Sequence, residues 1–96
     1  MRPSQSLELY RNQIGFIVAK NNAKNPRVFG SVLTGTDTEH SDLDLLVDPT
    51  ETTTLLDIAK IQNQLQKLLK VSVDVLTPKA LPSSFRQKIL KESKKV

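Results

Sequence analysis

Two aspartates separated by one residue, Asp42 and Asp44, are the side chains whose spacing most directly predicts chemistry. They open the apolar run 43–47, which predicts a strand. A strand sends alternate side chains to opposite faces, so both carboxylates share one face, about 7 Å apart at the Cα atoms. Like charges so placed repel, and burying either one unpaired is costly. A hard cation removes that repulsion, and Mg²⁺ usually binds one or two carboxylates together with substrate phosphates.

Gly30 and Ser31 offer the second half of such a site. A glycine at the end of a strand lets the backbone approach a ligand closely and adopt torsions that other residues avoid. The serine supplies a hydroxyl and an N–H group, and a helical turn beginning there would aim further N–H groups at an anion. A phosphate cradle beside a carboxylate pair is the equipment that metal-assisted phosphoryl or nucleotidyl transfer needs.

Asp74 is a third candidate because of its position within a later apolar run. Val71, Val73 and Val75 alternate toward one face of a predicted strand, which leaves Asp74 on the other face. A single acid on the solvent face of a strand is ordinary. Its place at the centre of an otherwise apolar strand favours the interpretation that it belongs to the site.

Ten residues, 32–41, separate Gly30-Ser31 from Asp42-x-Asp44. The resulting pattern G-S-x10-D-x-D resembles the signature of the polymerase-beta-like nucleotidyltransferase superfamily. More closely, the chain resembles a minimal nucleotidyltransferase (MNT) domain, which is found beside HEPN-domain toxins in prokaryotic toxin–antitoxin pairs. The resemblance covers nearly the whole chain, including Asp74 where the family carries its third acid. It implies an α/β (α+β) nucleotidyltransferase core over residues 1–96.

The resemblance also implies roles for the five candidate residues. Asp42, Asp44 and Asp74 would be catalytic and would hold Mg²⁺, with two ions some 3.5–4 Å apart. Asp74 would also help to deprotonate the acceptor hydroxyl, while Gly30 and Ser31 would hold the β- and γ-phosphates of ATP. The implied reaction transfers AMP to a tyrosine of the partner HEPN toxin and silences it.

Two other functions stay open at this point. A binding-only antitoxin would neutralise its toxin by covering it, without consuming ATP. An adenylyltransferase acting on a small molecule is the third possibility, and the small size of the chain argues against it. Thr34 stands where MNT domains often carry an arginine after the G-S pair, so nucleotide affinity or partner contact is expected to be weaker.

Composition sets broader limits. The 96 residues are 38% hydrophobic and only 4% aromatic, which indicates one small globular domain with an aliphatic core. Cysteine is absent, which excludes disulfides and thiolate metal sites and suits a cytoplasmic protein. We expect no membrane contact and no direct binding of nucleic acid, although the net charge of +4 suits phosphates, acidic partners and nucleic acid alike.

The elements that must position the candidates follow the order α-β-turn-β-α-β-α, with a mixed three-stranded sheet. We expect one helix over 5–22, capped by Ser4 or Ser6, and another from the threonine-rich run 50–54 to about residue 69. The strands are expected over 27–30, 42–47 and 71–76. A helical turn with a loop should occupy 31–41. Ser84 and Gln87 predict a capping box for a last helix, followed by a frayed charged tail.

The only histidine and the lysines near the C-terminus are expected to be solvated and to have no role in the site. His40 precedes the aspartate pair, but loop histidines are usually only solvated, so we expect it not to act as a base. The lysines near the C-terminus are expected to form a solvated helix face and tail: Lys88, Lys91, Lys94 and Lys95.

Overall fold

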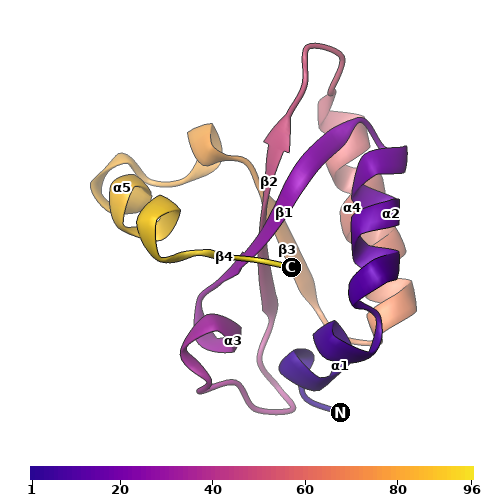
Figure 1. Ribbon diagram of the computed structural model, residues 1–96, viewed down its shortest axis with the longest axis vertical. Coiled ribbons are helices and arrows are strands. Elements are labelled where there is room, and N and C mark those ends of the chain that lie inside the picture. The colour runs from indigo at the N-terminus through magenta and orange to yellow at the C-terminus, as the bar shows by residue number, and fades with distance from the viewer.

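A four-stranded sheet lies at the centre of the computed structural model, which describes residues 1–96 (Figure 1). Its strands are β1 (Ala23–Phe29), β2 (Leu43–Pro49), β3 (Val73–Leu76) and β4 (Lys94–Lys95). They lie in the order β3-β2-β1-β4. β2 and β3 are parallel, whereas β1 runs antiparallel to both β2 and β4. The mixed sheet is confirmed, with one short strand more than the sequence predicts.

β2 carries the centre of the hydrophobic core. Leu43, Leu45 and Val47 are fully buried on one face, where they join Val28 of β1 and Val75 of β3. The alternation predicted for β2 and β3 is therefore confirmed on this face. The opposite face holds the aspartates, and its one fully buried β2 residue is Leu46.

Three helices cover the core face of the sheet: α1 (Pro3–Leu9), α2 (Arg11–Lys20) and α4 (Leu55–Leu69) (Figure 1). α4 packs on the sheet through Ile61 and Leu65, both of which are fully buried. Thr54 caps α4 reciprocally with Asp57: the Asp57 N–H donates to Thr54 Oγ1 at 3.2 Å, and the Thr54 N–H donates to Asp57 Oδ2 at 2.9 Å.

The single helix predicted over residues 5–22 is wrong, because the chain forms two helices with a break at Tyr10. Neither Ser4 nor Ser6 caps the start. The N-cap residue is Arg2, and the buried Ser6 hydroxyl donates to the carbonyl of Leu69 at 3.0 Å. This bond ties α1 to the end of α4. A sequence periodicity that runs through both helices cannot reveal such a long-range anchor.

β1 begins earlier than predicted, at Ala23 rather than Arg27. Its pairing with β2 is irregular between Lys24 and Arg27, where Asn25 has a φ of 56° and is followed by Pro26. Proline has no N–H to give to a ladder, so a bulge is where a strand tolerates it. β3 starts later, at Val73, because Lys70 closes α4 in the left-handed conformation.

The C-terminal part also differs from expectation. The short 3₁₀ turn η1 (Pro78–Ala80) leads into α5 (Ser83–Glu92), whose N-cap is Pro82 without a side-chain cap, so the Ser84–Gln87 capping box is wrong. The tail is not frayed, because β4 pairs with β1 and the Val96 N–H donates to the Pro26 carbonyl at 3.0 Å. α5 lies on the side of the sheet away from α2 and α4 (Figure 1). None of the helices is both long and apolar enough to cross a lipid bilayer.

Candidate active site

Gly30 forms the turn between β1 and the short helix α3 (Ser31–Thr34). Its torsions, φ 74° and ψ −148°, lie in a region that is close to glycine-only. A Cβ at this position would overlap the Asp44 carboxylate. Glycine is therefore required twice here, once by the backbone and once by the aspartate beside it.

Ser31 begins the helical turn, as predicted, and its hydroxyl makes no hydrogen bond within the chain. The neighbouring Thr34 hydroxyl is occupied: it lies 3.3 Å from the carbonyls of both Gly30 and Ser31. The turn thus presents one free hydroxyl and no positive charge of its own.

Asp44 and Asp74 lie on one face of the sheet, and the charge of Asp42 is near enough to act on Asp44. Asp44 and Asp74 are register partners on the parallel strands β2 and β3, which in a sheet lie about 4.8 Å apart. Asp42 directly precedes β2, two residues before Asp44. Asp44 is half-buried, while Asp42 and Asp74 are exposed. The positions inferred from strand phase therefore converge from two strands.

The electrostatics of this cluster centre on Asp44. Burial raises the pKa of Asp44, and the negative charges of Asp74 and Asp42 raise it further. In the present side-chain positions, no three acidic or histidine side chains are close enough to share a metal ion. The cluster is a concentration of uncompensated negative charge, which any cation bound there would relieve.

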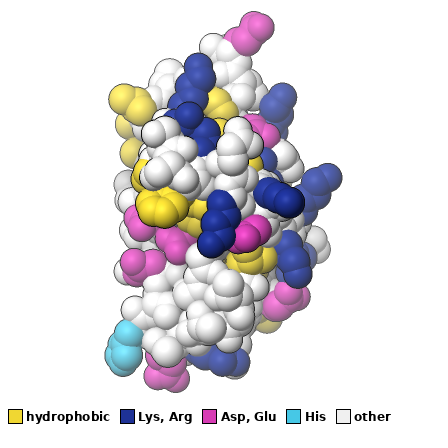
Figure 2. Space-filling view, turned by 90° about the vertical axis from the view of Figure 1, so that its left-hand side faces the viewer, with side chains coloured by type: hydrophobic (Ala, Val, Ile, Leu, Met, Phe, Trp, Pro, Cys, Tyr) yellow, Lys and Arg dark blue, Asp and Glu magenta, His cyan; other side chains and the backbone are white.

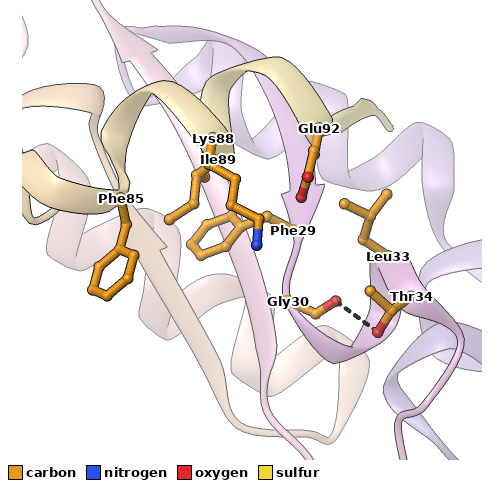
Figure 3. Close-up of a pocket in the computed structure, with 8 residues that line it drawn as sticks. All are labelled: Phe29, Gly30, Leu33, Thr34, Phe85, Lys88, Ile89 and Glu92. Carbon is orange, nitrogen blue, oxygen red and sulfur yellow. Dashed lines mark hydrogen bonds between the residues drawn. The ribbon is translucent and has the colours of Figure 1, made fainter.

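A pocket of about 280 Å³ lies beside the carboxylates and was not predicted from the sequence (Figure 3). Its lining combines β1, α3 and α5: Phe29, Gly30, Leu33, Thr34, Phe85, Lys88, Ile89 and Glu92. Phe29 pairs with Asp44 across β1 and β2, so the pocket adjoins the acidic cluster. The sequence offered one signal, the aromatic residue directly before Gly30, but not the packing of α5 against it.

The surface around α5 mixes charges with exposed apolar side chains (Figure 2). Lys and Arg side chains spread over this face, and hydrophobic and acidic side chains lie among them. Phe85 is the exposed aromatic of α5, with 58% of its surface accessible. The combination suits a ligand that carries both negative charge and a planar or apolar part.

The remaining basic candidates occupy different places. The side chain of His40 is exposed in the turn before β2 and makes no hydrogen bond. Lys88 and Lys91 are both exposed on α5, as predicted, but Lys88 also lines the pocket and Lys91 does not. Lys94 and Lys95 are exposed, so their predicted solvation is confirmed, but they lie in the strand β4 rather than in a frayed tail.

Comparison with known proteins gives matches along most of the chain. The family model described as polymerase beta, nucleotidyltransferase matches residues 12–96. A predicted protein adenylyltransferase of Methanocaldococcus jannaschii is 30% identical over 89 residues, which make up 93% of this chain and 91% of that protein.

Solved structures share the fold as well. A structure of a predicted minimal nucleotidyltransferase is 36% identical with a TM-score of 0.83, covering 97% of this chain and 93% of that one. A toxin–antitoxin crystal structure with AMP-PNP is 22% identical with a TM-score of 0.73, over 88% of this chain and 69% of that one. An MNT antitoxin in complex with a tri-AMPylated HEPN toxin of Shewanella oneidensis is 19% identical with a TM-score of 0.67, over 92% and 69% of the two chains.

Proposed function

Because this chain belongs to the polymerase beta nucleotidyltransferase family, we propose that it is an antitoxin that transfers AMP from Mg-ATP to a tyrosine hydroxyl of a partner HEPN toxin. Membership of the family makes the chain a nucleotidyltransferase. The name of the M. jannaschii relative supports a protein as the acceptor. The AMPylated HEPN toxin bound to an MNT antitoxin supports the kind of partner, although that structure by itself shares only the fold.

The observation that carries the proposal is the register of Asp44 with Asp74 beside the Gly30 turn. Asp44 and Asp74 share one face of the sheet on adjacent strands, and Asp42 lies two residues before Asp44. The turn at Gly30 brings the backbone against that face at Asp44, and Ser31, whose hydroxyl is free, follows directly. This combination suits a triphosphate whose phosphates bind at Gly30 and Ser31 while its α-phosphate lies at the aspartates.

Magnesium fits the donor set. Carboxylate oxygens are ligands that Mg²⁺ accepts, and it commonly completes its shell with water and substrate phosphates. Asp42, Asp44 and Asp74 would hold the ions, which requires the exposed side chains of Asp42 and Asp74 to turn toward Asp44. When bound, the ions would neutralise charge on the phosphates and on the three acids.

The chain's own residues then have distinct tasks in the transfer. The acceptor oxygen attacks the α-phosphorus, a new P–O bond forms, and the bond from the α-phosphorus to the bridging oxygen breaks. Its electron pair leaves with pyrophosphate. Asp74 takes the proton of the attacking hydroxyl, since it is the exposed carboxylate on the outer strand. Ser31 holds the departing phosphates through its hydroxyl.

ATP labelled at different phosphates tests the proposal. The purified chain is incubated with its HEPN partner, Mg²⁺ and ATP that carries label at either the α- or the γ-phosphate. Label from the α-position should enter the partner and label from the γ-position should not. Entry of the γ-label would mean phosphate transfer, and entry of neither label would refute transfer to the protein.

If neither label enters the partner but the partner still binds, the chain has a different antitoxin mechanism. A chain that copurifies with the toxin and protects cells, yet transfers no label, is an antitoxin that acts by covering its toxin. The acidic cluster would then be retained without catalysis.

A further inference from the structure

Lys88 of α5 extends into the pocket beside Gly30 (Figure 3). Among the pocket's eight lining residues it is the only lysine or arginine. Its side chain runs from α5 toward the Gly30 turn, in front of Phe29. The amine therefore faces the part of the site that the proposed function gives to the β- and γ-phosphates.

No other group in the chain uses this amine. The two ion pairs of the protein join Arg11 to Glu8 and Arg27 to Asp48. Glu92 lines the same pocket, one helical turn further along α5, but makes no ion pair with Lys88. Lys88 is thus a free cation.

The other basic side chains of α5 are placed differently. Arg86 is committed to structure, because its guanidinium donates to the carbonyls of Pro78 at 2.9 Å and Leu81 at 3.1 Å. Lys91 does not line the pocket. Lys88 alone on this helix combines a free charge with a position at the site.

Apart from Lys88, the phosphate side of the site offers no positive charge, and Glu92 adds a negative one. Ser31 and Thr34 are neutral, and the Thr34 hydroxyl is already used by backbone carbonyls. Asp44 and Asp74 on the next strands, and Asp42 just before β2, add negative charge. A triphosphate entering this site needs a cation on the Gly30 side in addition to metal ions at the aspartates. A lysine ammonium is a common phosphate ligand of this kind. Phe29, Leu33 and Ile89 form apolar walls beside Lys88, whose side chain is itself exposed to solvent.

We propose that Lys88 binds the terminal phosphates of the nucleotide and stabilises the pyrophosphate as it leaves. This inference rests on the proposed function. The ammonium group of Lys88 donates hydrogen bonds to phosphate oxygens. When the bond between the α-phosphorus and the bridging oxygen breaks, its electron pair stays on that oxygen. The oxygen leaves as part of pyrophosphate, which Lys88 contacts.

Binding measurements on Lys88→Gln test this without depending on transfer activity. By calorimetry, the variant should bind Mg-ATP and Mg-pyrophosphate about 10- to 100-fold more weakly than the parent, as expected for a lost charge-assisted hydrogen bond. AMP lacks both terminal phosphates, so its affinity should stay within about 2-fold. Lys91→Gln is the matched control, and Lys88→Arg should restore most of the affinity because it keeps the charge.

The outcomes separate this inference from the proposed function. Equal binding of Mg-ATP and Mg-pyrophosphate by the parent and Lys88→Gln would overturn the role of Lys88 and leave nucleotide transfer intact. An equal loss of affinity for AMP would also overturn it, because the effect would then not concern the terminal phosphates. A parent that binds none of these ligands would refute both proposals.

Discussion

Asp44 and Asp74 are register partners, side by side on adjacent parallel strands, with Gly30 packed against the Asp44 carboxylate. Neither carboxylate is paired with a lysine or arginine, since the two ion pairs of the protein lie elsewhere. This placement concentrates negative charge on an otherwise well-packed β2. A fold that keeps such a repulsive pair gains from a cation, and the predictions below follow from that.

Asp44→Asn should separate nucleotide binding from folding. At a hundred times the dissociation constant, Mg-ATP stabilises the parent by about 2.7 kcal/mol, or roughly 10 °C or more in Tm for a domain of this size. The variant should lose this shift. Its ligand-free Tm should equal or exceed the parent's, because removing Asp44's charge relieves repulsion. Equal stabilisation of both proteins by Mg-ATP would show that the carboxylates are not the metal site.

Gly30→Ala should be far more damaging than Gly35→Ala. Both glycines have positive φ, so either alanine strains the backbone by about 1–2 kcal/mol. A methyl group at Gly35 meets open space, whereas one at Gly30 overlaps Asp44, which adds about 1–3 kcal/mol. Urea unfolding of both variants measures the difference. Equal destabilisation would mean that Gly30 is retained for its torsions alone.

The rate of nucleotide transfer is a second test of Gly30→Ala. The variant displaces the Asp44 carboxylate, so transfer should be lost even at temperatures where it remains folded. Gly35→Ala should keep transfer when compared at equal folded fraction. Full activity in a folded Gly30→Ala protein would argue against close contact between the turn and the site.

Asp37 predicts a pH dependence in the part of the fold that holds α1. Its buried carboxylate accepts the Ser4 N–H at 2.9 Å, so it caps α1 from a distant loop. Burial alone would raise the pKa of Asp37, but hydrogen bonding from Ser4 and the charge of Arg2 outweigh it and lower the pKa. A lowered pKa gives stability that is present above the unfolded value, near 3.9, and is lost as the pH falls through the folded value.

Asp37→Asn keeps an oxygen that can accept the Ser4 N–H but removes the charge, so stability at pH 7 should fall by about 1 kcal/mol as a charge-assisted hydrogen bond becomes a neutral one. The difference from the parent should persist down to about pH 5 and shrink below about pH 4, as the parent's carboxylate becomes protonated. Thermal unfolding across this range measures it. A difference that stays constant from pH 7 to pH 3 would show that the charge of Asp37 contributes nothing.

The positions on the strands could be predicted because strand phase is a local property. Alternation placed Asp44 and Asp74 opposite the buried Leu45 and Val75, and the structure has them so. The helical turn at Ser31 and the end of α4 at Leu69 also follow from nearby residues.

What could not be predicted depends on contacts between distant parts of the chain. The break at Tyr10 accompanies the anchoring of Ser6 to Leu69, 63 residues away. The packing of α5 against β1, which creates the pocket and brings Lys88 to Gly30, has no local signal. The pairing of Lys94 with Val28 likewise turns a charged tail into an edge strand.

Asp74→Asn tests the central claim most directly, because it removes the base and keeps the shape of the side chain. Glu51→Gln, at an exposed acid in the turn after β2, is the control. Each protein is incubated with its HEPN partner, ATP and Mg²⁺, and the mass of the partner is measured by mass spectrometry. The parent and Glu51→Gln should add AMP, whereas Asp74→Asn should do so about 100-fold or more slowly while binding the partner equally well. Equal AMP addition by Asp74→Asn and the parent, or protection from toxicity by a parent that adds none, would contradict the account.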